Sequence, residues 1–125
     1  MESAVKMIPV LVLFSGAVAL GLYLGYEYLK RIPSRPVMIG IHLLLGAGGM
    51  ELVAMLLAGT PDGEAAPTGR LAHAAAALLL LALFTGLLAP MIGRRSRPTM
   101  NAALATHACA AGAGFVLLLA WFAFG

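Results

Sequence analysis

Four long apolar stretches fill almost the whole chain and leave it few possible folds. They cover residues 7–29, 36–58, 71–92 and 99–124. Each is long enough to cross about 30 Å of hydrocarbon, which takes about 20 residues as a helix. Inside lipid a single segment satisfies its own backbone N–H and C=O groups only as a helix. The sequence therefore predicts an all-α integral membrane protein, a four-helix antiparallel transmembrane bundle that forms one domain over residues 1–125.

The composition supports this class and excludes others. Of the 125 residues, 62% are hydrophobic and only 10% are charged, whereas about a quarter are charged in soluble domains. The net charge of +3 comes from cations at the ends of the apolar stretches. They form no basic stripe with interleaved aromatic residues, so nucleic-acid binding is excluded. The single cysteine, Cys109, has no disulfide partner within the chain and is predicted to be a small buried packing residue.

The positions of the charges predict the orientation in the membrane. The two short connecting segments are basic and the long one is acidic. By the positive-inside rule, a bacterial inner-membrane protein of this kind has both short loops in the cytoplasm and both termini outside. The residues concerned are Lys30, Arg31 and Arg35 in the first loop, Arg94, Arg95 and Arg97 in the third, and Asp62 and Glu64 in the second.

The three histidines, His42, His73 and His107, lie one each in three of the apolar stretches. An ionisable side chain within the membrane is a functional hypothesis by default, because burying it is costly. At about 1.5 Å per residue, His42 lies roughly 10 Å and His107 roughly 15 Å from the cytoplasmic helix ends. These two therefore share one half of the bilayer, whereas His73 is predicted near the opposite interface.

Small residues follow both inner histidines at matching offsets of four and seven positions. These offsets keep residues on one helix face, so each imidazole has a smooth strip beside it that would fit a flat macrocycle. Helical bundles commonly hold cofactors between facing helices. Two imidazoles on one haem iron favour electron transfer. The predicted cofactor-binding residues are His42 and His107 as ligands of the haem iron, with Gly46, Gly49, Ala111 and Gly114 beside the ring of haem b.

Two alternatives stand beside the haem reading. Glycine and alanine are abundant throughout the chain, so the strips also fit simple helix packing. The histidines would then bond across helices to hydroxyl or carbonyl groups, in a cofactor-free structural or accessory subunit. The other alternative is a small proton-coupled metal or solute carrier that uses Glu51 and His73.

The remaining ionisable groups near the outer side have several interpretations. His73 is a tentative metal ligand, paired with Met55 or with its own copy in a homodimer, or else an interfacial residue in contact with water. Glu51 is a tentative proton relay or quinol-binding group, or a neutral acid bonded across a helix interface. Glu27 is predicted to form a surface ion pair with Arg31.

The four short spans, with the placement of His42 and His107 and their small-residue strips, resemble the small bacterial four-helix b-type cytochromes of the cytochrome b561 and CopD-like group. The resemblance implies haem b, electron transfer in the lipid bilayer, and exchange with quinone or a membrane redox partner. The chain departs from two complete ligand pairs, because it has only three histidines in its spans. It contains no HExxH, CxxC or glycine-rich phosphate motif.

Overall fold

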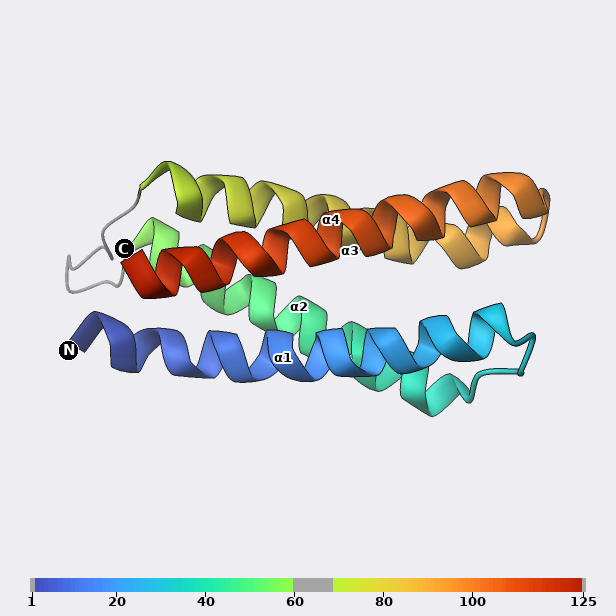
Figure 1. Ribbon diagram of the computed structural model, residues 1–125, viewed down its shortest axis with the longest axis horizontal. Coiled ribbons are helices and arrows are strands. Elements are labelled where there is room, and N and C mark those ends of the chain that lie inside the picture. Colours follow the sequence, from blue (N-terminus) through green and yellow to red (C-terminus); the bar gives the residue numbers. More distant parts are fainter. Residues whose placement is uncertain (1, 60–68, 125) are drawn as a thin grey trace. The chain divides into compact units, whose positions relative to one another are not determined.

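The computed structural model describes residues 2–59 and 69–124, and these form four helices (Figure 1). All four are long and apolar enough to cross a membrane, so the all-helical prediction is confirmed. Asp62 and Glu64 lie outside the described residues. The helices are α1 (Glu2–Leu29), α2 (Pro36–Ala58), α3 (Arg70–Gly93) and α4 (Arg97–Phe124).

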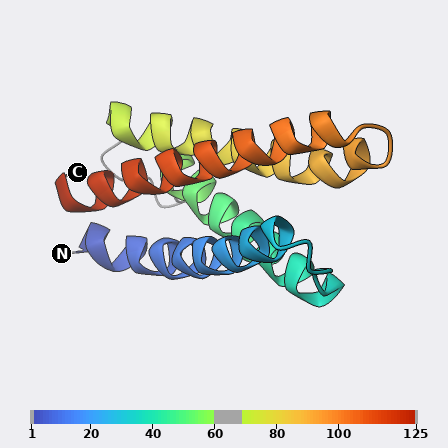
Figure 2. The same cartoon turned by 45° about the vertical axis from the view of Figure 1, so that its right-hand side comes forward.

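The chain has two compact units, Met1–Met55 and Leu56–Gly125. The first unit holds α1 and most of α2, and the second holds α3 and α4. In each unit two consecutive helices run antiparallel and are joined by a short basic loop (Figures 1 and 2). We call these two structures the first and the second hairpin.

The first hairpin turns through a hydrogen-bonded cap at the end of α1. The N–H of Ile32 donates to the carbonyl oxygen of Glu27 at 2.9 Å, and the N–H of Arg31 donates to that of Tyr28 at 3.1 Å. This pair of bonds is the Schellman motif, whose central residue takes the left-handed conformation and is usually glycine. Here Arg31 occupies that position, with a φ of 59°.

The second hairpin turns differently, through a side-chain cap on α4. The hydroxyl oxygen of Ser96 accepts the backbone N–H of Thr99 at 3.4 Å and its hydroxyl at 2.9 Å. Ser96 is thus the N-cap, and Pro98 lies in the first turn, where its missing N–H costs little. The helix therefore begins at Arg97, earlier than the apolar stretch that starts at Thr99.

Proline does not end either helix in which it lies. Pro90 is inside α3, which continues to Gly93. Membrane helices tolerate proline because neighbouring groups satisfy the backbone oxygen that loses its donor. Pro9 lies similarly inside α1.

Close packing in both hairpins depends on glycine. A methyl group added at Gly49 would lie 2.8 Å from Cε2 of Phe14, and one at Gly114 would lie 2.8 Å from Cγ of Leu79. Both glycines are buried, so Phe14 and Leu79 rest directly on the backbone of the facing helix. Cys109, in contrast, is exposed, and the prediction that it packs in the interior of the chain is wrong.

Candidate functional site

His42 is held against α1 by a hydrogen bond and a close contact. Its Nδ1 lies 2.9 Å from the carbonyl oxygen of Ala17, and because a carbonyl only accepts, Nδ1 carries the proton. The lone pair of the neutral ring is then on Nε2. A methyl group added at Gly21 would lie 3.0 Å from Cε1 of the ring. The half-buried imidazole therefore lies in the interface between α1 and α2, against the backbone at Gly21.

His107 has the same arrangement in the second hairpin. Its Nδ1 lies 2.7 Å from the carbonyl oxygen of Ala82 on α3. A methyl group added at Gly86 would lie 2.8 Å from Nδ1 and 2.9 Å from Cε1. This imidazole too is half-buried, and its Nδ1–H donates to the carbonyl oxygen. Both hydrogen bonds join residues 25 positions apart.

The two hairpins are equivalent at these positions. A shift of 65 residues carries each member of the first site onto the same residue type in the second. The packing contacts shift in the same way, because Phe14 on Gly49 becomes Leu79 on Gly114. The sequence analysis identified the histidines but missed this internal repeat and the acceptors. The repeated residues are Ala17 and Ala82, Gly21 and Gly86, Pro33 and Pro98, His42 and His107, and Gly49 and Gly114.

The predicted small-residue strips divide into two parts. Gly49 and Gly114 are taken up by contacts within their own hairpins, so Phe14 and Leu79 fill the space that the sequence analysis gave to a macrocycle. Gly46 differs, since a methyl group added there would meet nothing within 4 Å. Its counterpart Ala111 is half-buried. Of these four strip residues, Gly46 is thus the one shown to have open space beside it.

His73 lies apart from these sites, in the first turn of α3. It is exposed, and its Nδ1 lies 3.2 Å from the carbonyl oxygen of Gly69, four residues earlier. Glu51 and Met55 are also exposed, on α2. They belong to the first unit, whereas His73 belongs to the second.

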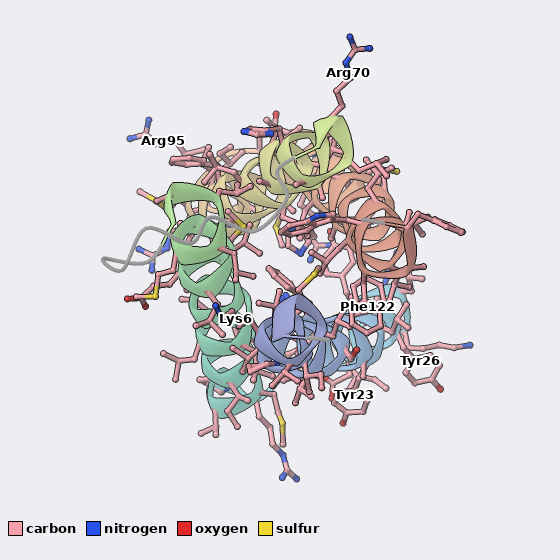
Figure 3. The ribbon with its side chains drawn as sticks, turned by 90° about the vertical axis from the view of Figure 1, so that its left-hand side faces the viewer. Lys6, Tyr23, Tyr26, Arg70, Arg95 and Phe122 are labelled. Carbon is pink, nitrogen blue, oxygen red and sulfur yellow. The ribbon has the colours of Figure 1, made fainter. Side chains whose placement is uncertain are left out.

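Glu27 has surroundings that the sequence did not predict. Its side chain is only 6% exposed and hydrogen-bonds with the hydroxyl group of Tyr23, one turn earlier. Its other carboxyl oxygen, Oε2, is buried and has no hydrogen-bond partner. The predicted surface ion pair with Arg31 is therefore wrong, because the carboxyl group is turned inward. Tyr23 and Tyr26 themselves project outward from α1 (Figure 3).

The candidate metal-binding side chains limit which kind of metal site the described residues could form. No cluster of three or more His, Cys, Asp or Glu side chains that would hold a bare ion occurs in residues 2–59 and 69–124. Among the described histidines, His42 and His107 each bond through Nδ1 to a carbonyl oxygen of the facing helix in their own hairpin. No family model, no curated protein and no solved structure matches the chain. Its function must therefore be read from the residues of the two hairpins.

Proposed function

We propose that the chain is a membrane-embedded b-type haem protein that transfers electrons, with His42 and His107 as the axial ligands. The observation that carries the proposal is the paired Nδ1 bond to a backbone carbonyl, 2.9 Å in one hairpin and 2.7 Å in the other. Histidines that bind metals almost always donate their second ring N–H to a carbonyl or carboxylate. That bond fixes the tautomer and makes Nε2 the ligand atom.

The rest of the chain fits this role. Haem supplies one-electron redox chemistry when bound, and bis-histidine ligation leaves no open position for oxygen. The apolar helices exclude water and lower the local dielectric, which tunes the potential. Gly46 and Ala111 remain as candidate neighbours of the macrocycle. The electron partner is a quinone or a membrane redox protein, and Glu51 and His73 are candidates for proton transfer near the outer face.

A cofactor-free structural or accessory subunit is the second candidate, and a specific observation favours it. Each imidazole already ties together the two helices of its own hairpin through the bond to Ala17 or Ala82. Interhelical hydrogen bonds of this kind contribute about 0.6 kcal/mol each in membrane proteins. In this role the histidines stabilise the hairpins and need no metal.

Optical spectroscopy separates the two candidates. The protein is purified in detergent from haem-replete cells, and its spectrum is recorded before and after dithionite. We expect a Soret band and sharpened α and β bands on reduction. Both His42→Ala and His107→Ala abolish them, whereas the control His73→Ala keeps them. A colourless wild-type preparation overturns the haem proposal and leaves the structural role.

A further inference from the structure

The carbonyl groups that accept the histidine bonds lie within continuous helices, where they are normally covered. Side chains on a helix tilt toward its N-terminus, so a residue covers the turn that precedes it. The residue four positions after an alanine therefore covers the carbonyl of that alanine. In α1 and α3 these covering positions are Gly21 and Gly86. The absence of a side chain there leaves Ala17 and Ala82 accessible to an imidazole from the facing helix.

The histidine rings lie close to these two glycines, whereas some other glycines of the same helices have no close neighbour. A methyl group at Gly21 would lie 3.0 Å from the ring of His42, and one at Gly86 would lie 2.8 Å from the ring of His107. At Gly25, one turn further along α1, and at Gly112 on α4, an added methyl group would meet nothing within 4 Å. Close contact with an imidazole is therefore made at Gly21 and Gly86 and is not shared by every glycine in these spans.

The two hairpins share this arrangement although they differ in much of their sequence. The shift of 65 residues that superposes the histidines also pairs Tyr23 with Leu88 and Glu27 with Ile92. These pairs differ in size and polarity. The alanine, the glycine and the histidine are nevertheless the same in both copies. The residues that fix the ring are thus among those that the two hairpins share.

We propose that Gly21 and Gly86 are positioning residues, which open a backbone carbonyl to His42 and His107 and so present Nε2 of each imidazole as a ligand atom. The same bond in both copies gives the two rings the same tautomer. The metal in this statement rests on the proposed function, whereas the control of the ring tautomer does not. A side chain at either glycine displaces the ring from the carbonyl, and Nδ1 then no longer holds the proton in a bond.

Nitrogen NMR tests the tautomer directly. The full chain is labelled with ¹⁵N-histidine and studied in detergent without haem. In the wild type we expect both rings to be neutral with the proton on Nδ1 in a hydrogen bond. Gly21→Ala changes the signals of His42 alone, and Gly86→Ala changes those of His107 alone. The matched controls Gly25→Ala and Gly112→Ala change neither.

Haem titration of the same variants adds a second readout. Loss of such an orienting bond typically lowers metal affinity about 10–100-fold, and we expect a loss in this range for Gly21→Ala and Gly86→Ala but not for the controls. Bound haem with unchanged affinity and tautomers in both variants overturns the positioning role and keeps the proposed function. Colourless protein whose histidine tautomers respond as expected overturns the proposed function and keeps the positioning role. If a variant does not fold, the nitrogen NMR spectrum of the wild type still tests the inference. Protons on Nε2 of His42 and His107 in that spectrum overturn it.

Discussion

The role of a glycine in these helices depends on which group of the facing helix lies against it. Gly21 and Gly86 lie under imidazole rings, whereas Gly49 and Gly114 lie under Phe14 and Leu79. All four are glycines, but the first pair controls the histidine–carbonyl hydrogen bonds and the second pair allows apolar side chains to pack on the helix backbone.

The packing role predicts a large difference between two neighbouring glycines of α4. A methyl group at Gly114 would lie 2.8 Å from Cγ of Leu79 and 3.2 Å from Cβ of Leu78, so the buried Leu79 side chain must change rotamer and the backbone at Leu78 must shift. We expect Gly114→Ala to lower the free energy of unfolding by about 1–3 kcal/mol. Gly112→Ala, whose added methyl group meets nothing, raises it by about 0.5–1 kcal/mol because alanine favours the helix. Unfolding in mixed detergent and SDS measures both, and equal effects would contradict this assignment.

The residues of the candidate site were predictable in part. His42 and His107 stand out from the sequence because a polar ring in an apolar span needs a partner. Their acceptors do not stand out, since any of many carbonyls is available until the crossing of the two helices is known. Glu27 was misassigned for a similar reason, because spacing alone pairs it with Arg31 whereas its carboxyl group is buried. The recurrence of Ala-x-x-x-Gly before each histidine was the signal that could have identified the acceptors.

The helices themselves follow the apolar stretches, and their ends follow other signals. α2 has the predicted bounds because Pro36 begins it after a basic loop. α4 begins before its apolar stretch because Ser96 caps it. Apolar residues indicate which part of a helix would lie in hydrocarbon, whereas capping groups indicate where the helical backbone begins. The ends of the apolar stretch and of the helix therefore need not coincide.

The cap of α1 offers a test at this scale. Arg31 adopts a left-handed conformation with a φ of 59°, which costs a residue with a Cβ atom roughly 1–2 kcal/mol. We expect Arg31→Gly to raise the free energy of unfolding by about 1 kcal/mol, because glycine adopts this conformation without strain. Arg35→Gly removes the same charge from the same loop without relieving strain, and is the control. A variant at position 31 no more stable than this control would contradict the expectation.

At the scale of the whole chain, the two hairpins have the same order of elements. Each begins with a helix that leads into a basic loop and ends with a helix that leads away from it. This order and the positive charge of both loops predict that the loops lie on the same side of a membrane. The positive-inside rule predicts that this side is the cytoplasm.

Cysteine labelling tests this orientation. In a Cys109→Ala background, Ser34→Cys and Ser96→Cys report on the two basic loops, and Gly59→Cys reports on the opposite end of α2. We expect a membrane-impermeant maleimide to label the two loop variants in inverted vesicles but not in intact cells. The Gly59→Cys variant shows the opposite behaviour. Labelling of the two loops from different sides would show that the hairpins do not share one orientation.

The short span of the histidine bonds bears on how the chain is made. Each bond joins residues 25 positions apart within one hairpin, and contacts between neighbouring segments form early because little chain must be ordered to close them. The acceptor for His42 is therefore synthesised before the imidazole that bonds to it. The same is true for His107. Each hairpin thus contains the acceptor for its own polar ring, and neither ring depends on a later segment of the chain for this hydrogen bond.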